Sequence, residues 1–328
     1  MKTIALLPVL VACALAATPI ASQAEKLRLG HISPPGSLYD QVATSFADKL
    51  ARASGGKDSI EVLPNGVLGS QPQLLSQLST GTLDFWVVDT PAITIAPAGR
   101  DYQALIAPFL FDTQADFRRF MQSPVAEEMA EKVRTAIGIR HLAVGADQAP
   151  RALSTRKSAV RKPSDLKGLK IRVPETPFLV DVWKAWGANP TPVKATELFS
   201  SLQSGLVDGQ ENGLGIFFDL SLNEVQEYFI QLDYVRSGVS IFMSEKTWQK
   251  LSPQSREHIA KAARDVSAES AAKYDSYMEG LRQRAREKGT KIVDPDVAEF
   301  RAAAVKILSD FDGKAWPKGL LERIRAVR

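Results

Sequence analysis

The amino-acid sequence of 328 residues contains only one cysteine and three histidines. Cys13 lies in a leader that we expect to be removed, which leaves the processed chain without a disulfide, a thiol nucleophile or a cysteine-ligated metal. His31, His141 and His258 fall in separate predicted elements, and the sequence has no GxSxG, HExxH or P-loop motif. We therefore expect a protein that is not an enzyme and that holds no metal ion and no cofactor.

An excess of charge of one sign is also missing, because 41 lysines and arginines face 37 acidic residues and give a formal net charge of +4. The basic residues are scattered along the chain, whereas a nucleic-acid-binding protein gathers them on one face among aromatic side chains. We therefore expect no nucleic-acid partner. An apolar content of 45% in a chain of this length is enough for a sizeable core, which we expect to be divided between two lobes.

The first 24 residues have the layout of a secretory signal peptide. Lys2 precedes a largely apolar run of 15 residues, which is shorter than the roughly 20 residues of a membrane-spanning helix. Small residues at Ser22 and Ala24 then mark a cleavage site, so we predict a periplasmic protein that is cut after Ala24. The alternative is a lipoprotein anchored at Cys13, with Leu10–Cys13 as its lipobox, and the mass of the processed chain distinguishes the two.

Strand and helix patterns alternate along the chain after the leader. A strand over Lys26–Gly30 leads into an amphipathic helix over Tyr39–Ala53, and a second strand, a helix and a third strand follow. This order predicts a mostly parallel sheet covered by helices. Further along, apolar residues at helical spacing predict one helix over Ala115–Ile137, which stops at Gly138.

Two segments are near copies of each other. LLSQLSTGTLD at Leu74–Asp84 and LFSSLQSGLVD at Leu198–Asp208 share five of eleven residues. Each copy is typical of a helix that ends at a glycine, Gly81 or Gly205, because a helix C-cap needs positive φ. We expect the aspartate at the end of each copy to serve a local turn. The repeat predicts two similar α/β units, and a ligand enclosed between them at the carboxyl ends of their strands.

A helical pattern of about 35 residues begins at Ser252, a good capping residue, with Pro253 in the first turn. Because helices usually have about 11 or 12 residues, we expect this one to run along both lobes. We assign residues 25–149 and about 240–279 to lobe I, and residues 150–239 and about 280–328 to lobe II.

Five short motifs stand in order along the chain: VLPNGVLGS (62–70), GTLD (81–84), DLKGLKIRVPE (165–175), GANPTPV (187–193) and ELFSSLQSGLVDGQEN (197–212). Together they resemble the DctP-type solute-binding proteins of tripartite ATP-independent periplasmic (TRAP) transporters. The resemblance implies an α/β fold, a two-lobed periplasmic-binding-protein clamp with a long helix spanning both lobes. It also implies a protein that closes around a small carboxylate ligand and hands it to the membrane permease subunits of a TRAP transporter. We expect a monomer.

The resemblance assigns the carboxylate clamp to Arg172, in the segment KIRVP. A guanidinium group is a planar fork that matches a carboxylate through two hydrogen bonds. Arg151 matches a second basic residue of many relatives, although a salt bridge at the domain edge is the alternative role for it. Asn212 matches a position that hydrogen-bonds the ligand. Gly213 follows it where relatives commonly have proline, which predicts a looser loop.

Further candidates lie near predicted strand ends. Glu175 and Asp89 would accept hydrogen bonds from ligand hydroxyls, which favours a hydroxylated acid over a plain dicarboxylate. Trp86 would offer an apolar wall, although an aromatic residue in a central strand is more often part of the core. His31 follows the first strand, where it would reach the cleft unless its role is structural.

The ligand stays open between two classes at this point. Ala195 stands where sialic-acid-type relatives have an aromatic residue, so a ligand that stacks there is not indicated. Arg236 stands where relatives often have histidine, and in the cleft it would engage the second carboxylate of a dicarboxylate or aldarate. Our leading hypothesis is a sugar acid such as a uronate or an aldonate. A ligand-sensing module of a periplasmic signalling receptor would share the same fold.

Overall fold

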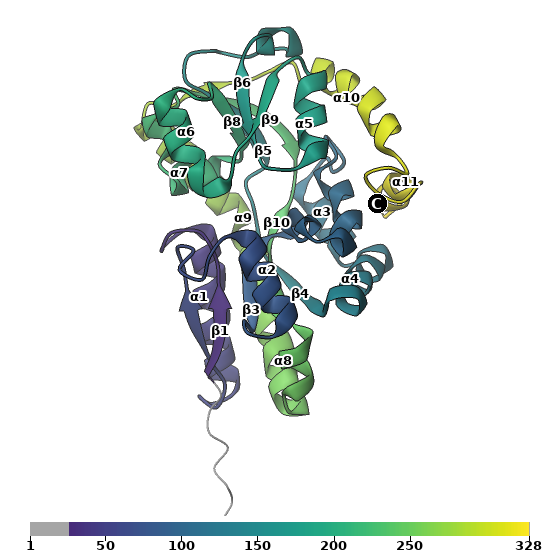
Figure 1. Cartoon of the computed structure of the whole chain (residues 1–328). Coiled ribbons are helices and arrows are strands. Elements are labelled where there is room, and N and C mark those ends of the chain that lie inside the picture. Colours follow the sequence, from purple (N-terminus) through teal and green to yellow (C-terminus); the bar gives the residue numbers. More distant parts are fainter. Residues whose placement is uncertain (1–25, 328) are drawn as a thin grey trace, which may run out of the picture.

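The computed structural model describes residues 26–327, which form two lobes, each built around one β-sheet (Figure 1). The predicted signal peptide and the lipobox at Cys13 lie outside the described residues. The sheet of lobe I has the order β2-β1-β3-β10-β4. Its strands are β1 (Lys26–Gly30), β2 (Ser59–Leu63), β3 (Phe85–Asp89), β4 (Ile139–Asp147) and β10 (Gly238–Ser244). The first three are parallel, as predicted, whereas β10 is antiparallel to β3 and β4.

The sheet of lobe II has the order β11-β9-β5-β8-β6-β7. Read from β7 to β9, it repeats the arrangement of lobe I, and β11 is an additional edge strand. Its strands are β5 (Arg151–Thr155), β6 (Lys170–Val173), β7 (Asn189–Pro192), β8 (Gly209–Asn212), β9 (Tyr228–Val235) and β11 (Lys291–Val293). Strand β6 is parallel to β7 and β8, just as β1 is parallel to β2 and β3. An antiparallel strand, β5, then follows β8 in the place that β10 takes beside β3. The predicted two-lobed α/β fold is confirmed.

The chain crosses between the lobes through its strands. β4 leads into β5 across residues 148–150, and β9 leads back into β10 across residues 236–237. Strand β10 therefore completes the sheet of lobe I although it follows most of lobe II in the sequence. Short connections of this kind are where a two-lobed protein hinges.

Helices pack around both sheets (Figure 1). Lobe I carries α1 (Leu38–Ala53), α2 (Gln71–Thr80), α3 (Gln114–Met121), α4 (Pro124–Ile137), α8 (Glu245–Lys250) and the 3₁₀ segments η1 (Thr90–Ile95) and η2 (Pro97–Ile106). Lobe II carries α5 (Pro177–Ala185), α6 (Leu198–Ser204), α7 (Leu214–Asp219) and the short 3₁₀ turns η3 (Pro163–Leu166), η4 (Ala195–Glu197) and η5 (Leu222–Glu224). Helix α1 buries Val42, Phe46 and Leu50 on one face, as its amphipathic pattern predicts.

Helix α9 (Pro253–Glu287) is 35 residues long and is the predicted spine of the molecule. Ser252 caps it by accepting a hydrogen bond from the backbone N–H of Ser255 at 3.0 Å. The helix packs against β4 and α1 in lobe I, and its residues Leu281 and Ala285 belong to a core cluster of lobe II. Neither α9 nor any other helix within residues 26–327 combines the length and the apolar character of a membrane span.

The two repeated segments fold alike. Gly81 and Gly205 end helices α2 and α6 in the left-handed conformation, with φ of 81° and 76°. Both glycines therefore have the C-cap role that the sequence predicts.

The aspartates that end the two copies do more than serve local turns, which is all that we expected of them. Asp84 accepts a hydrogen bond from the backbone N–H of Arg28 in β1 at 2.8 Å. Asp208 accepts one from the backbone N–H of Lys170 in β6 at 2.9 Å. In each lobe the aspartate thus ties the repeated segment to the neighbouring parallel strand.

The prediction of one helix over Ala115–Ile137 is wrong, because the structure has two helices there, α3 and α4. Pro124 lacks the backbone N–H that a continuous helix needs, and Ser123 accepts a hydrogen bond from the N–H of Ala126 at 3.3 Å. A new helix therefore starts at Pro124, although the apolar spacing continues across the break.

The carboxyl-terminal segment does not stay within lobe II, where we expected it. Helix α10 (Val297–Phe311) packs against α5 of lobe II, but α11 (Leu320–Arg325) lies against lobe I. There Arg323 forms an ion pair with Glu128 of α4 at 2.6 Å. Figure 1 shows α10 and α11 running down the side of the molecule from one lobe to the other.

Candidate functional site

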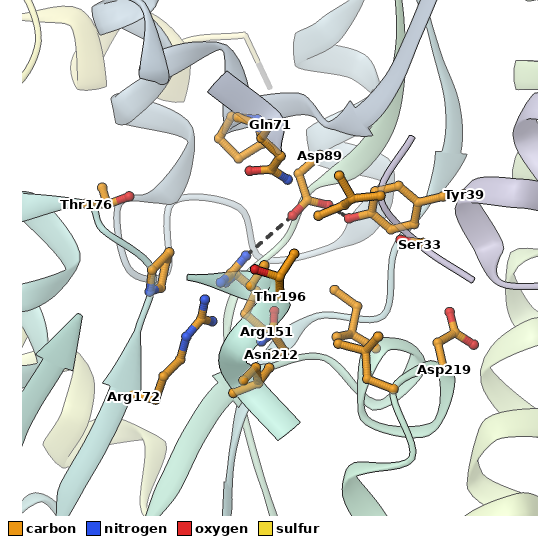
Figure 2. Close-up of a pocket in the computed structure, with 18 of the residues that line it drawn as sticks. Ser33, Tyr39, Gln71, Asp89, Arg151, Arg172, Thr176, Thr196, Asn212 and Asp219 are labelled. Atoms are coloured by element: carbon orange, nitrogen blue, oxygen red, sulfur yellow. Dashed lines mark hydrogen bonds and ion pairs between the residues drawn. The ribbon is translucent and has the colours of Figure 1, made fainter. Parts of the chain in front are cut away.

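A cavity of about 540 Å³ lies between the lobes, at the carboxyl ends of β3, β6 and β8 (Figure 2). Polar side chains of lobe I that line it are Ser33, Tyr39, Asn65, Gln71, Asp89 and Thr94. Polar side chains of lobe II that line it are Arg151, Arg172, Thr176, Thr196, Asn212, Asp219 and Ser221. This is where open α/β sheets bind ligands, and the volume suits a small molecule.

Arg172 in β6 is a buried cation without a carboxylate partner. Its Nε and Nη2 donate hydrogen bonds to the backbone carbonyl of Val193, at 2.9 and 2.7 Å, and only 3% of the residue is exposed. It forms no ion pair with any residue among 26–327. Burial lowers the pKa of Arg172 to about 10, because the charged form loses hydration that no neighbouring carboxylate replaces in full. The guanidinium is therefore a ready partner for a bound anion.

Arg151 in β5 is different, because its fork is already occupied. Nε and Nη2 donate to the two carboxylate oxygens of Glu211 at 2.7 and 2.5 Å, and the Tyr234 hydroxyl donates to Glu211 at 2.5 Å. All three side chains are buried. Arg151 therefore forms a salt bridge, which was the alternative role that we gave it. Arg151 also lines the cavity, and its Nη1 is 3.8 Å from the Asp89 carboxylate.

Asp89 ends β3 and faces Arg151 across the cleft (Figure 2). Its carboxylate accepts a hydrogen bond from the Tyr39 hydroxyl, which itself accepts one from the Gln148 side-chain amide at 3.1 Å. Burial raises the pKa of Asp89, and the positive charge of Arg151 opposes that shift. The result is an acceptor from lobe I, held in place by a tyrosine and next to an arginine from lobe II.

Asn212 ends β8 and lines the cavity beside the two arginines. Its Nδ2 donates to Gln210 Oε1 at 2.7 Å, which leaves its carbonyl oxygen for other donors. The looser loop that we expected after Asn212 is not present. A Cβ atom at Gly213 would lie 2.2 Å from the backbone oxygen of Ala149, so glycine permits a close approach of two backbone segments.

Four predicted site residues do not line the cavity: His31, Trp86, Glu175 and Arg236. His31 is buried and contacts Asp40 at 3.3 Å, in the turn that precedes α1. Trp86 packs in the core against Phe242, because its side chain lies on a face of the sheet three residues before the cleft end of β3.

The other two face solvent or the hinge. Glu175 is exposed, while its neighbours Pro174 and Thr176 line the cavity. Arg236 lies in the connection from β9 to β10, where its Nη2 is 3.9 Å from Asp233. It therefore adds no guanidinium to those of Arg151 and Arg172 at the cavity.

Sequence reasoning missed several residues that shape the cleft. Tyr39 is the second residue of α1. Glu211 directly precedes Asn212 in the motif DGQEN, so its place in that motif could have pointed to it. Asp219 ends α7, where no motif marked it. Burial raises the pKa of the Asp219 carboxyl. Within residues 26–327, no group of three or more His, Cys, Asp or Glu side chains is arranged to hold a metal ion.

The sequence is similar to those of known proteins along most of its length. Residues 29–314 match DctP, the model of bacterial extracellular solute-binding protein family 7. A solute-binding protein of Roseobacter denitrificans is 33% identical over 299 residues, which cover 89% of this chain and 88% of that protein. The sialic acid-binding periplasmic protein of Vibrio cholerae is 28% identical over 322 residues, covering 95% of this chain and 96% of that protein.

Solved structures share the fold across almost the whole chain. A TRAP periplasmic solute-binding protein of Chromohalobacter salexigens with bound D-glucuronate has a TM-score of 0.86 at 27% identity, over 92% of this chain and 100% of that one. The Roseobacter denitrificans protein with bound L-galactonate has a TM-score of 0.84 at 28% identity, over 93% of this chain and 99% of that one. The chain therefore belongs to bacterial extracellular solute-binding protein family 7, the DctP family, as its five motifs predict.

Proposed function

We propose that the protein binds a sugar acid with a single carboxylate, such as a uronate or an aldonate, and delivers it to the membrane subunits of a TRAP transporter. The observation that carries the proposal is Arg172, a buried guanidinium at the cavity whose hydrogen bonds go only to a backbone carbonyl. A ligand carboxylate supplies the counter-charge that the protein does not.

The hydroxylated body of a sugar acid suits the rest of the cleft. Asp89 and Asn212 offer acceptor oxygens, and Thr176, Thr196 and other hydroxyl-bearing side chains line the same cavity. Related proteins from Roseobacter denitrificans and Chromohalobacter salexigens hold L-galactonate and D-glucuronate in their crystal structures. These relatives favour the same ligand class here.

A single carboxylate is favoured over two. Arg236, the residue that would engage a second carboxylate, does not line the cavity. The guanidinium of Arg151 is engaged by Glu211 through two hydrogen bonds. Of the arginines that line the cavity, Arg172 is the one whose fork holds no carboxylate of residues 26–327, which supports a ligand with one carboxylate over a dicarboxylate or an aldarate.

Both lobes contribute to the cavity, so binding favours the closed arrangement by contacts that an open arrangement lacks. The crossings at residues 148–150 and 236–237 act as the hinge. The membrane subunits then recognise the closed protein and receive the ligand chemically unchanged, since the cleft serves binding rather than turnover. Export through a signal peptide cut after Ala24 places this cycle in the periplasm, and the mass of the processed chain tests the cut.

The experiment is a thermal-unfolding screen of the processed protein against uronates, aldonates, aldarates, C4-dicarboxylates and keto acids. A ligand at a thousandfold excess over its Kd adds about 4 kcal/mol of stability, which gives a clear rise in Tm. We expect the rise with uronates or aldonates. Native mass spectrometry of the same sample identifies a ligand retained from expression, and NMR of the recovered ligand shows whether it is unchanged. A response confined to dicarboxylates, or a chemically altered ligand, contradicts the proposal.

A further inference from the structure

Asp219 is a cleft carboxylate with one oxygen free. Its Oδ2 accepts a hydrogen bond from the backbone N–H of Leu38, the first residue of α1 in the opposite lobe, at 3.3 Å. Among residues 26–327, Asp219 forms no ion pair and no second hydrogen bond, and the only cation whose charge lowers its pKa is Arg284 of α9. Since a carboxylate accepts several hydrogen bonds, the remaining oxygen has capacity for a donor from a ligand in the cavity that it lines.

The backbone holds Asp219 firmly in place. Helix α7 packs so closely on α9 that a Cβ atom at Gly215 would lie 2.2 Å from the Tyr277 hydroxyl. Two residues after Asp219, Ser221 has a φ of 54°, a left-handed conformation that a non-glycine residue adopts at a cost. Ile216, Leu220 and Ser221 line the cavity together with Asp219. The carboxylate therefore belongs to a fixed wall of the cleft rather than to a mobile loop.

Asp219 and Arg172 lie on opposite sides of the site, with Arg151 and Asn212 between them (Figure 2). A ligand whose carboxylate binds Arg172 therefore extends its other end past Arg151 and Asn212 in the direction of Asp219. The end of the ligand remote from its carboxylate meets an acceptor, not a cation.

The charges around the cavity favour a ligand with one carboxylate over a ligand with two. Of the described residues, Arg151 and Arg172 are the only lysines or arginines that line the cavity. Three carboxylates surround them: Asp89, Glu211 and Asp219. One ligand carboxylate at Arg172 has a cation to pair with, whereas a second carboxylate near Asp219 meets no cation of the cavity lining, because Arg284, whose charge acts on Asp219, is exposed and lies outside that lining. Repulsion between two carboxylates is strong where the cleft excludes water.

We propose that Asp219 sets the selectivity of the cleft at the end remote from Arg172, where it accepts a hydrogen bond from a ligand hydroxyl and excludes a second carboxylate. The inference rests on the proposed function, because it requires the ligand carboxylate at Arg172. It goes further by naming the residue that separates a uronate or aldonate from the aldarate of the same carbon skeleton.

The test compares matched ligand pairs by calorimetry. D-Glucuronate is paired with D-glucarate, and D-galacturonate and L-galactonate are each paired with galactarate. The wild-type protein is expected to prefer the monocarboxylate in each pair that it binds. Asp219→Asn keeps an oxygen for the Leu38 N–H and removes the charge, so the preference should fall by about tenfold or more, chiefly through tighter aldarate binding. Asp48→Asn, at an exposed position of α1, removes the same charge outside the cleft and should leave the preference unchanged.

The outcomes separate the two proposals. If Arg172→Ala abolishes binding but Asp219→Asn leaves the preference unchanged, the selectivity role of Asp219 is wrong and the proposed function stands. Equal binding of an aldarate and its monocarboxylate by the wild-type protein also overturns the role. If no monocarboxylate binds, or if Arg172→Ala binds normally, the proposed function fails and this inference fails with it. Circular dichroism checks the fold of each variant, and Asp219→Ser replaces Asp219→Asn should the latter misfold.

Discussion

The two copies of the repeat share a backbone and differ in the chemistry of their last strand. In β3 the three residues after Phe85 are apolar: Trp86, Val87 and Val88. In β8 the three residues at the same offsets are polar: Gln210, Glu211 and Asn212. All six are buried. Lobe I thus uses the strand to fill a core, whereas lobe II uses it to carry hydrogen-bonding groups that must be satisfied inside the protein.

The first strands of the two units show the same contrast. Gly30 in β1 pairs with Trp86, and Arg172 in β6 pairs with Gln210, so glycine and arginine occupy equivalent positions. A Cβ atom at Gly30 would lie 3.0 Å from the Leu74 side chain, so a larger residue there requires that side chain to move. In the proposed function, the duplicated architecture supplies the clamp, and the departures of lobe II from lobe I supply the recognition chemistry.

The largest effect should come from breaking the buried polar strand of lobe II. Glu211→Ala leaves the Arg151 charge buried without its partner, which costs about 3 to 5 kcal/mol of unfolding free energy. Val87→Ala at the equivalent position of lobe I removes only apolar contacts and should cost about 1.5 to 3 kcal/mol. Urea denaturation measures both. The double variant Arg151→Met/Glu211→Leu should recover stability, and a double variant as unstable as Glu211→Ala would contradict the unpaired-charge explanation.

Removing Arg172 should affect binding and spare the fold. Arg172→Ala is expected to weaken binding of the sugar acid by about 2 to 5 kcal/mol, because the bound carboxylate loses its counter-charge. Arg172→Lys should also lose much of the affinity, since an ammonium lacks the planar fork. The ligand-free protein should be no less stable, because the guanidinium has no carboxylate partner to lose. Calorimetry and unfolding curves check both parts, with exposed Arg161→Ala as the control.

Unchanged affinity in Arg172→Ala would remove this residue from the site and, with it, the main contrast between β1 and β6. A large loss of stability without ligand would instead mean that its hydrogen bonds to Val193 are structural.

The equivalent aspartates of the repeat provide a smaller test of how closely the lobes match. Asp84→Ala should cost about 2 to 3 kcal/mol, because Asp84 accepts hydrogen bonds from the Arg28 backbone and, at 2.7 Å, from the Thr247 hydroxyl. Asp208→Ala should cost about 1 kcal/mol, because its bond to the Lys170 backbone is exposed. Urea denaturation of both variants measures the difference. Equal costs would show that the Thr247 contact adds nothing.

The succession of strands and helices, the repeat and the long helix could be predicted because each has a local signal: alternation, glycine caps and an uninterrupted helical pattern. The place of β10 between β3 and β4 could not. The position of Asp89 at the cleft also follows from that pattern, since carboxyl ends of parallel strands meet there, whereas Arg172 and Asn212 were assigned through the family resemblance. Side-chain direction in the turns after the strands could not be predicted. His31 and Glu175 sit next to lining residues and yet point elsewhere, because the backbone of a turn, not strand alternation, sets their orientation.

Contacts between residues far apart in the chain could not be predicted from the sequence either. The pairing of Arg151 with Glu211 depends on the antiparallel register of β5 and β8, which no local pattern specifies. Asp219 reaches the cleft because α7 packs on α9 more than fifty residues later in the chain. These contacts arise from tertiary packing, and in the proposed function they decide what the cleft binds.

The smallest expected effects are at the glycine caps, where the two copies should behave most alike. Gly205→Ala forces an alanine into the left-handed region and should cost about 1 kcal/mol, because the new Cβ would have only the Arg156 side chain near it, at 3.9 Å. Gly81→Ala should cost slightly more, because its Cβ would lie 3.2 Å from Cβ of Lys246. Thermal unfolding of both variants, with the double variant to test additivity, measures the costs. A cost of this size at both caps, slightly larger at Gly81, would confirm that the two glycines have the same backbone role. A neutral Gly205→Ala would show that lobe II relaxes around its cap and that the two copies are equivalent in sequence only.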